Sequence, residues 1–108
     1  MDKANTTIIA ALNDHARQSF RGCRVKITQG IQTLEDVSTV LRQVQQFDAF
    51  TTSNDPYGER DFGSFRYAAE TIFWKFDYYD VDLQMHSPDP SDPTVTARVL
   101  TIMLADEY

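Results

Sequence analysis

Cysteine is scarce in this sequence, and both a long apolar run and a leader segment are missing. Cys23 is the only cysteine among 108 residues, so no disulfide can form within the chain. No stretch of about 18 apolar residues occurs, and the N-terminus lacks the charged and then apolar pattern of a secretory signal. We therefore expect a cytoplasmic protein in a reducing environment.

Basic residues are also few. Ten lysines and arginines stand against sixteen aspartates and glutamates, which gives a net charge of −6 at pH 7. Residues 1–54 carry six basic and five acidic side chains, or +1, whereas residues 55–108 carry four and eleven, or −7. Because like charges repel, this balance disfavours direct binding to nucleic acids and to anionic membranes.

Apolar residues are sufficient for one core. The chain is 42% hydrophobic, with seven phenylalanines, five tyrosines and one tryptophan, which argues against disorder. Two separate cores would each fall below the size at which a core is usually stable. The sequence therefore predicts a single domain over residues 1–108.

Apolar residues recur at helical spacing in two segments. The first predicts a helix over Thr6–Arg21, with Gly22 at its left-handed C-terminal cap. The second predicts a helix from Thr33, whose hydroxyl would cap its first turn, to Phe47.

Three segments alternate between apolar and polar residues as strands do. They are residues 23–28, Phe62–Ala68 and Thr71–Tyr79, the last two joined by a tight Ala69-Glu70 turn. The even positions from 72 to 78 share one apolar face. The opposite face is mixed, which suits a partly exposed antiparallel sheet.

The last segment has two interpretations. Asp92-Pro93 would suit the start of a helix, yet the β-branched residues of 94–104 favour a buried strand, and we expect the strand. Residues 87–93, with three prolines, form a loop before it. The elements predict an α+β fold in the order α-β-α-β-β-β, with both helices packed on one face of an antiparallel sheet.

Several long strings resemble a known family. They are FDAFTTSNDPYGERDFGSF, IFWKFDYYDVDL, SPDPSDP and ARVLTIMLADEY, within a region from about Leu12 to Tyr108. The chain resembles a family of small bacterial proteins known only as a domain of unknown function. The resemblance implies a family most common in alphaproteobacteria and often carried on plasmids or other mobile elements. It implies no activity, cofactor or catalytic residue.

The acidic residues of the second half could support two kinds of chemistry. Carboxylates that converge can hold a divalent cation, or they can form an acid–base pair in a hydrolase. However, NDPYGERD has neither the spacing of an EF-hand loop nor its terminal glutamate, and Asp-Pro-Tyr-Gly is an ordinary turn sequence. We therefore assign no metal, cofactor or catalytic residue. The carboxylates concerned are Asp55, Glu59, Asp61, Asp77, Asp80 and Asp82.

Two further sites have simpler structural explanations. Cys23 would need His15 or His86 as a base, and its place on the apolar strand face predicts an inert thiol. A basic strip could contact DNA in a regulator, but it lacks an aromatic stacking platform and the acidic half would repel a duplex. The strip consists of Arg17, Arg21, Arg24 and Lys26.

The acidic and aromatic second half instead favours binding to a protein with a basic surface. Tyrosines are common interface anchors, and complementary charge accelerates encounter. Together with the resemblance, this predicts a non-enzymatic mobile-element accessory or anti-defence factor. Such an inhibitor would occupy a nucleic-acid-binding surface, as anti-CRISPR and anti-restriction proteins do. The alternatives are a metal-dependent hydrolase and a DNA-contacting regulator. The predicted contact residues are Asp55, Tyr57, Glu59, Asp61, Asp77, Tyr79, Asp80 and Asp82.

Overall fold

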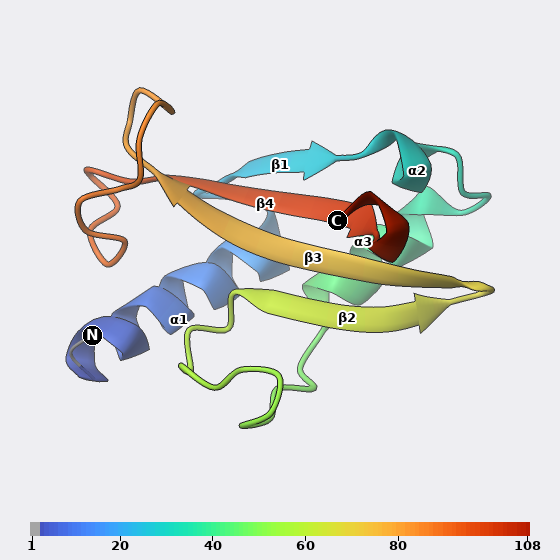
Figure 1. Ribbon diagram of the computed structural model, residues 1–108, viewed down its shortest axis with the longest axis horizontal. Coiled ribbons are helices and arrows are strands. Elements are labelled where there is room, and N and C mark those ends of the chain that lie inside the picture. Colours follow the sequence, from blue (N-terminus) through green and yellow to red (C-terminus); the bar gives the residue numbers. More distant parts are fainter. Residues whose placement is uncertain (1–2) are drawn as a thin grey trace.

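One four-stranded sheet organises the protein. The computed structural model describes residues 3–108. The strands stand in the order β1-β4-β3-β2 (Figure 1). β3 pairs antiparallel with β2 and with β4, whereas β1 pairs parallel with β4. The strands are β1 (Arg24–Ile27), β2 (Phe62–Tyr67), β3 (Glu70–Tyr79) and β4 (Ala97–Leu104).

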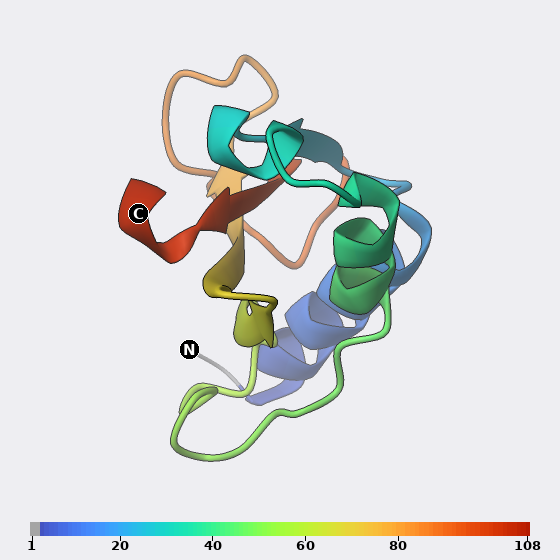
Figure 2. The same ribbon diagram turned by 90° about the vertical axis from the view of Figure 1, so that its right-hand side faces the viewer.

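Two main helices, α1 (Lys3–Ser19) and α3 (Val37–Gln45), cover the same face of the sheet (Figure 2). The one-turn helix α2 (Gln29–Gln32) follows β1, and the 3-10 helix η1 (Ala105–Glu107) lies beyond the other face. The predicted α+β fold is confirmed. The sheet is mixed, however, and not entirely antiparallel. Side chains alternate in the same way in both strand directions, so the sequence pattern does not reveal the direction of β1. No described helix is long and apolar enough to cross a membrane.

The core lies between the helices and the sheet. Trp74 on β3 and Leu100 on β4 are fully buried, and Ile9 of α1 and Val44 of α3 pack into the same cluster. Burial of such a side chain contributes about 1.5–3 kcal/mol. The predicted alternation along residues 72–78 is confirmed, as is the strand expected within residues 94–104.

The second helix begins later than predicted. Thr33 ends α2 instead of starting the long helix, and the N-cap of α3 is Asp36. Its carboxylate accepts a hydrogen bond from the Thr39 N–H at 3.1 Å and others from the hydroxyls of Ser38 and Thr39. These bonds lower the pKa of Asp36. A carboxylate satisfies more donors of the first turn than a hydroxyl does, so Asp36 sets the boundary.

The turn between β2 and β3 lies one residue earlier than predicted. Tyr67 pairs with Glu70, which leaves Ala68 and Ala69 as the turn. Ala68 has a φ of 53°, in the left-handed region. A Cβ atom there costs about 1–2 kcal/mol, and glycine avoids this cost.

We expect Ala68→Gly to raise the free energy of unfolding by about 0.5–1 kcal/mol, because relief of the Cβ clash exceeds the added entropy of the unfolded chain. Urea unfolding measures the change. Ala69→Gly is the matched control and should destabilise, since Ala69 does not have a positive φ. A loss of stability in Ala68→Gly would contradict this turn geometry.

Candidate functional site

The predicted contact residues fall in three places. Asp77 and Tyr79 alternate onto the uncovered face of the sheet, opposite Tyr78. A second group precedes β2: Asp55, Tyr57, Glu59 and Asp61. The third, Asp80 and Asp82, follows β3. The structure therefore does not bring all eight residues onto one surface, and their role in binding stays a prediction.

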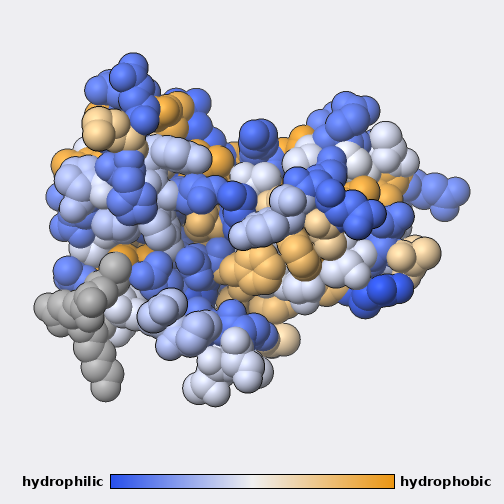
Figure 3. Space-filling model, viewed as in Figure 1, coloured by the Kyte–Doolittle hydropathy of each residue, from blue (hydrophilic) through white to orange (hydrophobic). Residues whose placement is uncertain are grey.

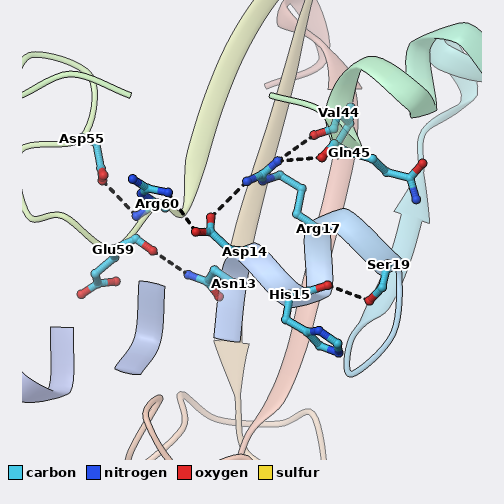
Figure 4. Close-up of polar contacts among 10 residues, drawn as sticks. All are labelled: Asn13, Asp14, His15, Arg17, Ser19, Val44, Gln45, Asp55, Glu59 and Arg60. Carbon is cyan, nitrogen blue, oxygen red and sulfur yellow. Dashed lines mark hydrogen bonds and ion pairs between the residues drawn. The ribbon is translucent and has the colours of Figure 1, made fainter. Parts of the chain in front are cut away.

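The group before β2 is held against α1 (Figure 4) and against the core. The Asp55 carboxylate accepts a hydrogen bond from the Arg60 N–H at 3.0 Å, which closes the turn. The Arg60 guanidinium pairs with Asp14 of α1 at 2.9 Å. Glu59 accepts a hydrogen bond from the Tyr78 hydroxyl at 3.0 Å. These contacts give most of the charges in NDPYGERDFGSF a structural role, whereas Tyr57 is 82% exposed.

A buried polar network continues from this loop across the core. The Asn13 side chain, which is fully buried, donates to the Tyr78 hydroxyl at 2.8 Å and to the Glu59 carbonyl at 3.0 Å. Its oxygen accepts from Arg98 Nε at 2.7 Å, and Arg98 also donates to the Pro90 carbonyl at 2.6 Å. Every polar atom of the Asn13 amide is thereby used, as burial of a polar group requires.

Arg17, expected in an exposed basic strip, is buried. Only 1% of its surface is exposed, and its guanidinium donates to the carbonyls of Val44 and Gln45, each at 3.1 Å. Figure 4 shows the side chain running from α1 to the end of α3. Arg21, Arg24 and Lys26 remain exposed. Arg17 is therefore not available on the surface to contact DNA as part of the predicted basic strip. Arg17 lies one helical turn after Asn13, so both residues are on the same face of α1. This spacing was the only signal in the sequence that could have predicted the burial of Arg17.

Cys23 is half-buried. Its thiol donates to the Ala16 carbonyl at 3.8 Å, and burial raises its pKa. The group is therefore a neutral thiol at pH 7, whereas a nucleophilic cysteine needs the thiolate.

Asp61 gives a pH-dependent prediction. Burial, and secondly the Glu59 carboxylate, raise the pKa of Asp61. A raised pKa means that the folded state binds the proton more tightly, so stability is lost as pH rises through the range between the unfolded and folded values. We expect Asp61→Asn to raise Tm at pH 7, with the gain vanishing below about pH 4, near the ordinary aspartate pKa.

Thermal unfolding between pH 3 and pH 8 tests this expectation. Asp82→Asn is the control, at an exposed carboxylate with no hydrogen-bond partner among residues 3–108. A lower Tm for Asp61→Asn at pH 7 would show that the carboxylate is stabilising and would contradict the assignment.

The uncovered sheet face carries a shallow groove of about 530 Å³. Lys75 and Asp77 form an ion pair across its floor at 2.9 Å, and the Lys75 ammonium lies 5.9 Å from the centre of the Tyr108 ring. The groove also contains Lys26 and Thr28. Figure 3 shows hydrophilic and hydrophobic residues intermixed on this face. Because charges of both signs are present and partly paired, the groove favours no single ligand charge.

The acidic loop, residues 79–87, extends the end of β3. Tyr79 pairs with His86, and the Asp80 N–H donates to the Met85 carbonyl at 2.8 Å. The Asp80 carboxylate accepts from the Gln84 N–H at 3.0 Å. The loop projects from one end of the sheet (Figure 1). It is therefore an ordered hairpin with defined side-chain positions.

Comparison with known proteins identifies a family. Residues 27–107 match the family described as protein of unknown function (DUF3768). The chain belongs to the DUF3768 family. The resemblance to a domain of unknown function is thus confirmed. No curated protein and no solved structure matches the chain.

The DUF3768 match covers α3, strands β2 to β4 and the acidic loop, and leaves α1 outside. Yet α1 supplies Asn13, Asp14 and Arg17, which hold the loop before β2 and the end of α3. Tests of the DUF3768 region therefore require a chain that retains α1.

The carboxylates of this DUF3768 protein are dispersed. Within residues 3–108, no three histidine, cysteine, aspartate or glutamate side chains form a group that could hold a metal ion. The reason is local: Asp55 closes its own turn, Glu59 binds Tyr78, and Asp77 lies on the other face of the sheet.

Proposed function

We propose that the protein is a non-enzymatic binding module that engages a basic surface of another protein through the acidic loop. One observation carries the proposal: the loop exposes Val81 by 60%, Leu83 by 40% and Met85 by 71%, beside the carboxylates of Asp80 and Asp82. Exposed apolar side chains that gather together mark interaction sites. The carboxylates beside them select for positive charge.

The sequence segment that contains the loop carries charge of one sign, although Asp77 within it pairs with Lys75. Residues 76–97 contain five aspartates and no lysine or arginine. Asp80, Asp89 and Asp92 each accept hydrogen bonds from their own turns, which holds them in place. Charges held in position lose less side-chain entropy on binding, so more of their attraction contributes to affinity.

The partner class that fits is a nucleic-acid-binding protein, whose basic surface is complementary to this end of the molecule. The resemblance to mobile-element proteins supports a finer proposal. In it, the protein is an accessory or anti-defence factor that inhibits such a partner, in the manner of anti-CRISPR or anti-restriction proteins.

We expect Asp82→Lys and Met85→Ser each to weaken capture of the partner about tenfold, the equivalent of about 1.4 kcal/mol. The first substitution reverses a charge, and the second removes an apolar contact. The measurement is quantitative crosslinking of the immobilised protein in an extract of its own host cells, with partners identified by mass spectrometry. Capture should also fall with added salt, because the contact is electrostatic.

Glu35→Lys and Ile8→Ser are matched controls, an exposed acid and an exposed apolar residue elsewhere on the molecule. Equal capture by all four variants, or a captured partner without a basic surface, would contradict the proposal. Calorimetric titration with calcium, magnesium, manganese and zinc provides a second check. Micromolar metal binding that Asp61→Asn abolishes would favour the metal-dependent hydrolase instead.

A further inference from the structure

The two edges of the sheet differ in how they are protected. β1 has only four residues, and two of them, Arg24 and Lys26, are exposed cations, which discourage pairing with another strand. β2 has six residues, no proline, and Arg66 as its only charge. An edge of this kind is a template for another strand.

The backbone groups that face outward from β2 follow from its register. Phe76 donates its N–H to the Asp61 carbonyl, and Gly63 pairs with Trp74. Since backbone polar groups alternate sides along a strand, those of Phe62, Ser64 and Arg66 point away from β3. No backbone hydrogen bond from another segment of residues 3–108 reaches these outward groups.

We propose that the outer edge of β2 pairs antiparallel with β2 of a second copy of this chain, with Ser64 on the two-fold axis. Two four-stranded sheets then form one eight-stranded sheet. The outward N–H and C=O groups of Ser64 bond to those of Ser64 in the second copy. The outward N–H and C=O groups of Phe62 bond to those of Arg66 in the second copy. By symmetry, the outward groups of Arg66 bond to those of Phe62 in the second copy.

A second copy is the occupant because the strand is complementary to itself in this register. Phe62 and Arg66 lie on the uncovered face, so each Phe62 ring meets the Arg66 guanidinium of the other copy, an attractive cation–π pair. Phe62 is already held edge-on to Phe73, with ring centroids 5.1 Å apart. On the other face, half-buried Phe65 lies opposite Gly63 of the second copy, which has no side chain to obstruct the pair and is already covered by Trp74 of its own chain.

Sedimentation velocity over a range of concentrations tests the pairing, and the wild-type chain should form a dimer. Ser64→Pro removes an N–H that no bond within one copy uses and should give a monomer with unchanged circular dichroism. Phe62→Lys should also give a monomer, since the introduced ammonium would oppose the Arg66 guanidinium of the other copy. Adding Arg66→Glu to Phe62→Lys should restore the dimer through opposite charges.

Cysteine crosslinking tests the register on a Cys23→Ala background. Ser64→Cys should form an intermolecular disulfide, because directly paired Cα atoms lie about 5.5 Å apart. Arg66→Cys alone should not, whereas a mixture of Phe62→Cys and Arg66→Cys chains should crosslink to each other. A wild-type monomer at all concentrations, a dimer that persists in both Ser64→Pro and Phe62→Lys, or a failure of Ser64→Cys to crosslink would overturn the proposal. The capture experiment on the acidic loop is independent of each of these outcomes.

Discussion

Replacement of Arg17 by methionine is expected to lower the free energy of unfolding by about 3–5 kcal/mol, the usual cost of breaking a buried charged network from one side. The guanidinium donates to two carbonyls in the last turn of α3 and pairs with Asp14 at 3.0 Å. Those carbonyls belong to the four that a helix leaves unpaired at its C-terminus. Without Arg17 the half-buried Gln45 carbonyl loses its donor, and the Val44 carbonyl keeps only the bond from the Phe47 N–H at 3.3 Å.

Methionine isolates this polar contribution, because its unbranched chain fills much of the space of the arginine stem. The guanidinium also lies 5.1 Å from the centre of the Trp74 ring, a contact that methionine partly replaces. Lysine at position 17 keeps the charge but cannot donate from a planar fork to three acceptors, so we expect Arg17→Lys to recover less than half of the loss.

Urea denaturation measures these differences. Arg21→Met is the control, since Arg21 is exposed four residues further along the chain and should lose less than about 0.5 kcal/mol. A loss below about 1 kcal/mol in Arg17→Met would mean that the network contributes little, because water would then replace the guanidinium at both carbonyls.

Replacement of Gly63 by alanine is expected to cost about 3 kcal/mol, at the upper end of the range for overpacking. A Cβ atom on Gly63 would lie 2.3 Å from Trp74 Nε1, far inside van der Waals contact. Trp74 has no room to move, because it is fully buried and the rings of Phe47 and Phe76 meet it edge-on at 5.4 and 6.1 Å. Either the strand or the indole must shift.

Gly22→Ala is the matched control. Gly22 has a φ of 73° and no atom within 4 Å of its notional Cβ, so only the backbone cost of about 1–2 kcal/mol applies. Near-ultraviolet circular dichroism distinguishes the two variants, because only Gly63→Ala should alter the environment of Trp74. Equal stability and unchanged tryptophan signals in both variants would refute close packing of Gly63 against the indole.

Local chemistry was sufficient to predict several parts of the candidate site. The turn at Asp55 to Gly58 follows from its proline and glycine, and Asp55 closes it through the Arg60 N–H. The exposed acidic segment after β3 also follows from composition. The roles of Glu59 and Arg60 could not be predicted, because their partners Tyr78 and Asp14 lie 19 and 46 residues away.

The sequence by itself determined the α+β class, the buried face of β3 and the concentration of negative charge in the second half, because alternation, helical spacing and composition are local properties. Tertiary structure alone decided that β1 runs parallel to β4, that Arg17 is buried while Arg21 is not, and that Asp77 and Glu59 lie on opposite sides of the sheet. Each of these depends on which distant segments meet. A polar side chain has the same local pattern whether it faces water or a buried partner, so only the packed chain distinguishes the two.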